Sequence, residues 1–196
     1  MLIFLLKGNK YEKLQFLVKP EHLQKGEINK VITLSDGNLA TAERAAISIW
    51  KSLFIKGENK FEFSKEIITE NDTCQLLEVN PQVLVCGIYS TELIILYKKL
   101  GEDYLLHGKV TNVQNHGNNS NGMAKINDNL FCVAGKNSFI FIVSVELVQV
   151  IQKINIAENN SYMYKYVKFL HNCNNEFIFT SFDGKKIIQF KIIVDE

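Results

Sequence analysis

One short apolar segment recurs five times along the chain at nearly constant spacing. The five copies align without gaps and can be superimposed at Leu6, Trp50, Tyr97, Val143 and Phe190. The steps between these residues are 44, 47, 46 and 47 positions. A period of about 40 to 50 residues is typical of β-propeller blades, in which each repeat forms one small sheet. The spacing therefore predicts a repeat architecture for the whole chain.

Each period holds four short apolar stretches separated by Gly, Pro, Asn and Asp residues, which favour tight turns. Four short strands per period make one blade. The sequence therefore predicts an all-β fold: a β-propeller fragment of four-stranded antiparallel blades, three complete and two partial. We take residues 1–196 as one propeller segment, with a partial blade at 1–20, blades at 28–67, 75–110 and 122–154, and a partial blade at 166–193.

The third stretch of each period is apolar almost throughout, as in 93–97 and 139–143. A strand of this kind needs cover on both faces of its sheet. The turns are too short for crossover helices, whereas propeller blades cover one another by stacking around an axis. This pattern favours a propeller over a β-sandwich.

Residues 41–55 carry a competing helical signal. Their apolar residues recur at helical spacing, so this segment alone would make a plausible amphipathic helix. The repeat predicts a strand instead, because the four equivalent segments are rich in β-branched and aromatic residues. We expect the repeat to decide, and a circular dichroism spectrum dominated by helix would contradict this expectation.

Two stretches carry a more specific pattern. The first has a Ser-Asp-Gly turn with Asp36 and Gly37, a strand of small residues, and an alternating strand that reaches Trp50. The second has the turn Asp183-Gly184 in the last repeat. In these stretches the chain resembles the WD40-repeat family. The resemblance implies a propeller and, for these five motif residues, a structural role.

The chain also departs from the WD40 pattern. The family's Gly-His pair, which joins a hydrogen-bonded network with the turn Asp and the strand Trp, occurs in no copy. The turn aspartate is replaced by Glu43 or Arg44 in the copy that keeps its tryptophan. The repeats are therefore degenerate, and another propeller family of similar blade length stays an alternative. Kelch repeats are disfavoured because their double glycine is absent.

Charge and apolar runs exclude several partners. Lys plus Arg number 22 and Asp plus Glu number 21, so the chain has no overall attraction to nucleic acid or anionic membranes. No apolar run approaches the roughly 20 residues that cross a bilayer. The opening apolar run 1–6 is too short for a secretory signal. We therefore expect a cytoplasmic protein that binds neither nucleic acid nor membrane.

The four cysteines lie far apart, without a CxxC pair or a His-x-x-x-His partner. This arrangement argues against a structural zinc site and favours buried, reduced thiols. The positions are Cys74, Cys86, Cys132 and Cys173.

No P-loop, GxGxxG, HExxH, GxSxG or kinase signature is present. We therefore predict no catalytic, cofactor-binding or metal-binding residues and no enzymatic activity. A propeller hydrolase with an axial metal is the less favoured alternative. Its polar candidates are the asparagines near the first strands, for which turn formation is the simpler role: Asn29, Asn80, Asn127 and Asn172.

Residues 112–122 form the most polar stretch and include His116, Asn118 and Asn119. These three residues are the candidate interaction loop, although a simple connection between blades would have the same composition.

The function that the resemblance implies is a protein-protein interaction scaffold or adaptor. A structural subunit of a larger complex is the alternative. Closed propellers need about four to eight blades. We therefore expect that the chain is part of a larger propeller, completed by further blades, by self-association or by a second chain.

Overall fold

The computed structural model describes residues 2–7, 10–23, 27–55, 58–88, 93–111, 113, 122–134, 139–155, 166–173, 176–182 and 187–193. These residues form antiparallel strands and one short 3-10 helix, η1 (Glu21–Leu23). The chain divides into two compact units, Met1–Thr73 and Cys74–Glu196. The predicted all-β class is confirmed.

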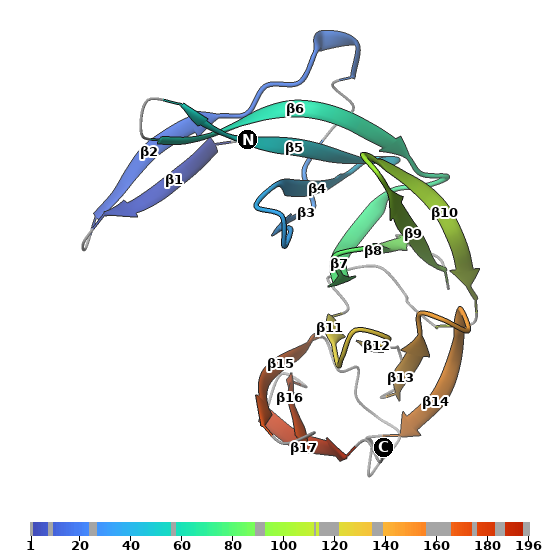
Figure 1. Cartoon of the computed structure of the whole chain (residues 1–196). Coiled ribbons are helices and arrows are strands. Elements are labelled where there is room, and N and C mark those ends of the chain that lie inside the picture. The colour runs from blue at the N-terminus through green and yellow to red at the C-terminus, as the bar shows by residue number, and fades with distance from the viewer. Residues whose placement is uncertain are drawn as a thin grey trace. The chain divides into compact units, whose positions relative to one another are not determined.

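The first unit contains a two-stranded and a four-stranded sheet (Figure 1). Strands β1 (Leu2–Lys7) and β2 (Lys10–Phe16) pair as a hairpin. The second sheet has its strands in chain order, each antiparallel to the next. Its members are β3 (Lys30–Thr33), β4 (Leu39–Glu43), β5 (Ala46–Ile55) and β6 (Glu58–Ile68).

The second unit contains two four-stranded sheets and one three-stranded sheet, again in chain order. The first comprises β7 (Thr73–Asn80), β8 (Val83–Ile88), β9 (Ile94–Leu100) and β10 (Asp103–Val110). The next comprises β11 (Met123–Lys125), β12 (Leu130–Ala134), β13 (Phe139–Ser144) and β14 (Gln149–Asn155). The last comprises β15 (Tyr166–Cys173), β16 (Glu176–Phe182) and β17 (Ile187–Ile193). The described residues thus form three four-stranded sheets and two smaller ones, as the repeat predicts.

The segment with the helical signal is β-structure. Residues 46–50 of β5 are all buried, and each pairs with β4 on one side and with β6 on the other. A helix in this position would leave the backbone of both neighbouring strands unpaired. Burial of a long apolar strand therefore outweighs the local helical spacing.

A β-bulge recurs at the same place in each four-stranded sheet. The register shifts next to Trp50, Tyr97 and Val143, the residues that define the repeat. One residue of the outer strand is left without a partner at each shift: Ser64, His107 and Ile151. A bulge bends its strand and increases the local twist, so all three outer strands change direction at the same place. No pattern in the sequence indicates these bulges.

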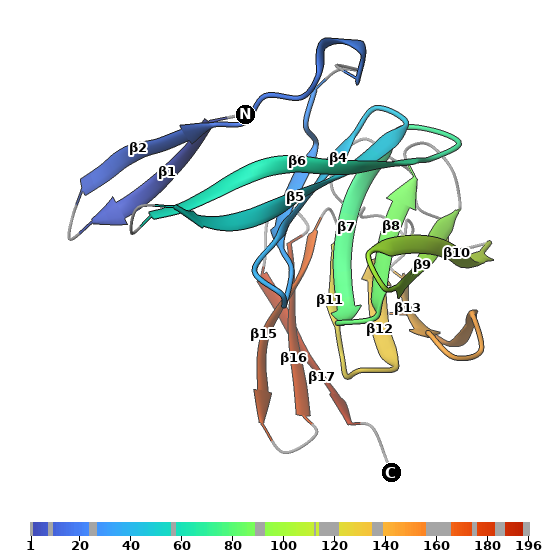
Figure 2. The same ribbon diagram turned by 45° about the horizontal axis from the view of Figure 1, so that its top comes forward.

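The two four-stranded sheets of the second unit stack face to face. One apolar cluster includes Val85 and Leu96 from the first sheet and Phe131 and Phe141 from the second. Figure 2 shows β7 and β8 beside β11, β12 and β13. Strands β11 and β12 also contact β15 of the last sheet. The predicted stacking of consecutive sheets is therefore present within this unit.

No helix in the described parts of the chain has the length and apolar character needed to span a membrane.

Candidate functional site

The turn between β3 and β4 has the shape that its sequence predicts. Gly37 has a φ of +83°, a conformation that glycine adopts without steric cost. Asp36 Oδ1 accepts a hydrogen bond from the backbone N–H of Asn38 at 3.0 Å. Asn38 Oδ1 in turn accepts one from the N–H of Ser52 at 2.8 Å. Asp36 and Gly37 thus shape the turn, and Asn38 fastens it to β5.

Trp50, the third family-motif residue, lies in the core of the first unit and is 2% exposed. Its Nε1–H donates to Thr41 Oγ1 at 3.1 Å, and Thr41 Oγ1 donates to Glu43 Oε1 at 2.8 Å. Phe63 packs edge-on against the indole, with 5.7 Å between ring centroids. A buried indole N–H normally requires such a partner.

Lys19 completes this buried network. Its Nζ lies 2.8 Å from Glu43 Oε2 and 2.7 Å from Glu66 Oε1. It also lies 5.7 Å from the centroid of the Phe63 ring. All three charged side chains are at most 7% exposed. Two carboxylates thus share one ammonium group, and each charge has a partner, as buried charges require.

This network was not expected, because the Gly-His pair of the WD40 pattern is absent. The structure shows a cation supplied by Lys19 and a carboxylate supplied by Glu43, beside the threonine and tryptophan of the same sheet. One feature of the sequence indicates the backbone conformation at Lys19: it precedes Pro20, and the residue before a proline is usually extended. That preference places Lys19 in an extended segment just after β2.

We name residues 15–19 the strap. Alternate side chains of the strap point toward the sheet β3–β6: Gln15, Leu17 and Lys19. Gln15 Nε2 donates to the carbonyl of Phe61 at 2.6 Å, and Gln15 Oε1 accepts from the N–H of Phe61 at 2.8 Å. Leu17 is buried with Trp50 and packs beside Phe61. Phe16 and Val18 are exposed.

The buried hydroxyl of Ser48 lies in the same sheet but does not join the hydrogen-bonded network. Ser48 pairs directly with Thr41 on one side and with Glu66 on the other, so the three side chains share one face. Within the described residues its buried hydroxyl has no hydrogen-bond partner. The polar network is therefore extensive but not complete.

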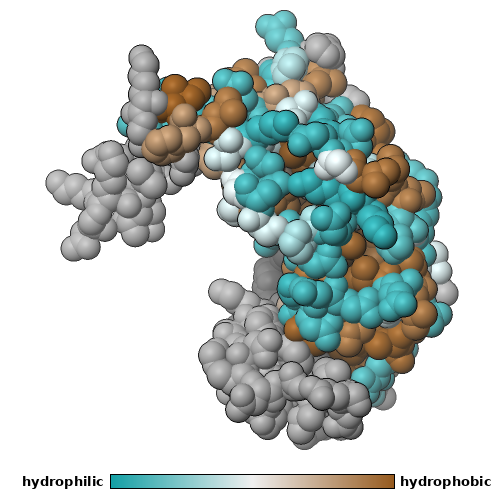
Figure 3. Space-filling model, viewed as in Figure 1, coloured by the Kyte–Doolittle hydropathy of each residue, from teal (hydrophilic) through white to brown (hydrophobic). Residues whose placement is uncertain are grey.

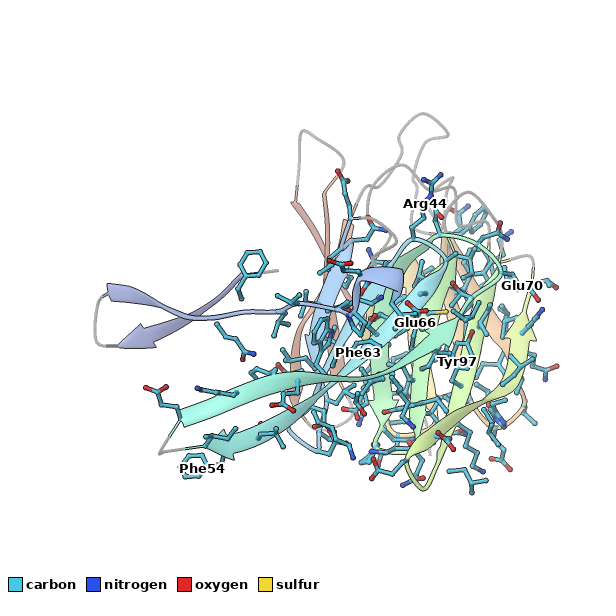
Figure 4. All side chains as sticks on the ribbon, turned by 90° about the horizontal axis from the view of Figure 1, so that it is seen from above. Arg44, Phe54, Phe63, Glu66, Glu70 and Tyr97 are labelled. Atoms are coloured by element: carbon cyan, nitrogen blue, oxygen red, sulfur yellow. The ribbon has the colours of Figure 1, made fainter. Side chains whose placement is uncertain are left out.

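Beyond Leu39, where β4 begins, strands β5 and β6 continue as an arm. Residues 51–55 of β5 have no partner in β4. Cross-strand pairing places Phe54 on the same face as Trp50, Phe61 and Phe63. Leu17 covers this face near Trp50, whereas Phe54 is 76% exposed at the far end of the arm (Figure 4).

In the second unit, the bulge of β10 fastens the strand to the next sheet. His107 Nε2 lies 3.1 Å from the carbonyl oxygen of Val145. A Cβ on Gly108 would lie 2.4 Å from Val148 Cγ1, so only glycine leaves room for this valine. Val148 has a φ of +51°, which is unfavourable for a β-branched residue. The bulge is thus a point of close attachment between two sheets.

Four leucines near this attachment are more than half exposed: Leu100, Leu105, Leu106 and Leu147. Leu105 and Leu106 belong to β10, Leu100 ends β9, and Leu147 lies in the turn beside Val148. Figure 3 shows hydrophobic side chains at the surface where β10 and β14 lie. Gatherings of exposed apolar side chains often mark sites of protein binding.

Several predicted residues lie outside the described part of the chain: Asp183, Gly184, His116, Asn118 and Asn119. Three asparagines weighed as metal ligands bond to backbone atoms instead. Asn29 Nδ2 donates to the Thr73 carbonyl, Asn80 Nδ2 to that of Asp128, and Asn127 Oδ1 accepts from Leu130 N–H. Asn172 lies within β15. Among the described residues, no group of three or more His, Cys, Asp or Glu side chains could hold a metal ion.

Two of the cysteines, Cys86 and Cys132, are buried free thiols. Burial raises the pKa of the Cys132 thiol to about 12, although hydrogen bonds with the backbone of Ala124 and of Cys132 itself act in the opposite direction. At neutral pH this thiol is protonated, which makes it a poor nucleophile.

No family model matches the chain, and no curated protein matches it at a significant level.

Proposed function

We propose that the chain is a non-enzymatic scaffold of the WD40-like propeller type that binds other proteins in the cytoplasm. The proposal combines the resemblance in the sequence with the recurrence of four-stranded sheets in chain order. In the second unit these sheets stack through a continuous apolar cluster. Stacked sheets of this kind supply a rigid base for loops and strand edges that contact partners.

The observation that carries this proposal is the pair of exposed leucines before the β10 bulge, Leu105 and Leu106, one on each face of the strand. Leu105 and Leu106 are 53% and 58% exposed, while the residues that follow them are fixed by Val145 and Val148. Leucines on an anchored strand lose little conformational freedom when a partner covers them. The balanced net charge of the chain argues for protein rather than nucleic acid as the partner.

The test is affinity capture from cell extract with three forms of the tagged full chain. These are the wild type, the double variant Leu105→Ser/Leu106→Ser, and the control variant Ile68→Ser. Ile68 is 63% exposed in the first unit, so the control removes a similar apolar surface elsewhere. We expect the wild type and the control to retain the same proteins and the double variant to lose them.

Circular dichroism must show the same β-rich spectrum for all three forms. Equal retention by the double variant and the wild type would place binding elsewhere and overturn the proposed site. Retention of no protein above background by the wild type would contradict the scaffold function itself.

A further inference from the structure

Three side chains of the strap contact the sheet β3–β6. No strand pairing joins it to β6; instead the Gln15 amide makes both hydrogen bonds to Phe61. Leu17 and Lys19 are then inserted into the sheet's core. The first two strap residues, Gln15 and Phe16, also end β2 and pair with β1. The strap can therefore leave together with the hairpin β1–β2 without breaking the ladders of β3–β6, because the strand pairs of that sheet do not include it.

The surface that receives the strap has a specific chemistry, and we name it the strap site. It presents a backbone edge at Phe61, an apolar recess beside Leu39 and Trp50, and two carboxylates at Glu43 and Glu66. These features accept an amide, an apolar side chain and an ammonium group at alternate positions. The charges of the strap and its site are complementary: the strap inserts one ammonium group between two carboxylates.

Every copy of the chain carries both a strap and a strap site. The strap is joined to β3 by residues 20–29, a connection that includes Pro20 and Gly26. A segment that carries three specific side-chain contacts and is joined to its sheet by a connection of this length is suited to exchange between identical chains. The second copy offers the same amide, leucine and lysine at the same spacing.

We propose that the strap of one copy can occupy the strap site of a second copy, so that two chains associate by exchanging this segment. The partner is therefore a second molecule of this protein. The inference does not depend on the proposed scaffold function, which rests on β10 in the other unit. In the wild type, the connected strap has an effective concentration in the millimolar range, so the closed single chain predominates at lower concentrations.

The exchange is tested by mixing two complementary variants of the full chain. Lys19→Met keeps the strap site but impairs the strap. Glu43→Gln/Glu66→Gln keeps the strap but impairs the site. Only in the mixture can the intact strap of the glutamine variant occupy the intact strap site of the methionine variant. In the reciprocal contact, the methionine side chain of one chain lies against the two neutral glutamine amides of the other.

The readout is size-exclusion chromatography with light scattering at equal total concentration. We expect the mass of one chain for each variant alone and the mass of two chains for the mixture. A mixture that keeps the mass of one chain overturns the proposal. If either variant is unfolded alone, recovery of a β-rich spectrum together with the two-chain mass on mixing supports it, and failure to recover overturns it.

A second measurement uses a fluorescent synthetic peptide with the sequence of residues 13–21. We expect it to bind Lys19→Met at least tenfold more tightly than the wild type, whose own strap competes. The same peptide carrying Lys19→Met is the control and should lose at least tenfold in affinity. Equal binding of both peptides would show that the carboxylates do not recognise the lysine, and would contradict the proposal.

Discussion

The sheets β3–β6 and β7–β10 share one strand order and one bulge position but have different interiors. The pairing registers make Thr41 equivalent to Cys86, Ser48 to Ile95, and Glu43 to Ile88. The first sheet therefore holds a buried polar network where the second holds apolar side chains. The same backbone arrangement thus accommodates either a buried polar network or an apolar interior. The network is therefore not a requirement of the fold.

The outer strands of the sheets differ in the charge that they carry at one equivalent position. Glu66, the second carboxylate around Lys19, is equivalent to Lys109 in β10 and Lys153 in β14. Lys153 lies 3.8 Å from the ring centroid of Phe139, where the ring face attracts its ammonium group. The outer-strand charge thus changes sign between units: it binds a buried lysine in the first and covers an aromatic ring in the second.

The largest expected effect comes from breaking the polar network. Lys19→Met leaves Glu43 and Glu66 buried without their ammonium partner, so we expect a loss of about 3–5 kcal/mol in the free energy of unfolding. Chemical denaturation followed by tryptophan fluorescence measures it, because Trp50 lies in the same network. Lys153→Met in the second unit is the matched control, since that lysine is exposed. Equal losses would remove the distinction between the two sheets.

A smaller loss is expected from closing the space beside the β10 bulge. The Cβ of Gly108→Ala would lie 2.4 Å from Val148 Cγ1, and relief of this overlap should cost about 1–3 kcal/mol. The double variant Gly108→Ala/Val148→Ala should recover part of that cost, because the smaller side chain makes room. Thermal unfolding of the four members of this cycle measures the coupling. Strictly additive effects would show that the two residues do not meet.

The repeat predicts the strands and sheets because burial on both faces leaves a period in the sequence. Trp50, Tyr97 and Val143 mark third strands, and all three are buried next to the bulge. The same repeat correctly predicts β-structure for residues 46–55, although their local apolar spacing indicates a helix. The apolar composition that requires burial belongs to each strand by itself, so sequence alone can reveal it.

The network and the bulges could not be predicted in the same way, because both depend on contacts between distant segments. Lys19 meets Glu43 and Glu66 only after β2, β4 and β6 come together. His107 is recognisable as a bulge residue only once the register of β9 and β10 is known. A charged residue in a loop is ordinarily exposed, so the sequence offered no reason to expect Lys19 in the core.

The apolar sheet β11–β14 predicts a stability change at high pH. The pKa of the Cys132 thiol, ordinarily 9.0, is raised by burial to about 12 in the folded protein. The unfolded chain therefore loses this proton first, and the stability contributed below pH 9 is lost as the pH rises from 9 toward 12. At pH 10 the loss should be about 1.4 kcal/mol.

The control for this prediction is Cys132→Ala, which removes the thiol and keeps the other titrating groups. Denaturation between pH 7 and pH 11 should show a steeper decline in the unfolding free energy for the wild type than for the variant. Parallel curves would mean that the thiol ionises equally well in both states.

The smallest effect concerns two residues with positive φ, one in each unit. Ala45 has a φ of +53° in the turn between β4 and β5, and Val148 has a φ of +51° in the turn between β13 and β14. Ala45→Gly should stabilise the protein by about 0.5–1 kcal/mol, because glycine adopts this conformation without strain. Val148→Gly relieves the same strain but removes a side chain that packs on the core of the second unit, so it should destabilise. Thermal unfolding of both variants gives the two signs. A stabilising Val148→Gly would show that the valine contributes less through packing at Gly108 than it costs in backbone strain.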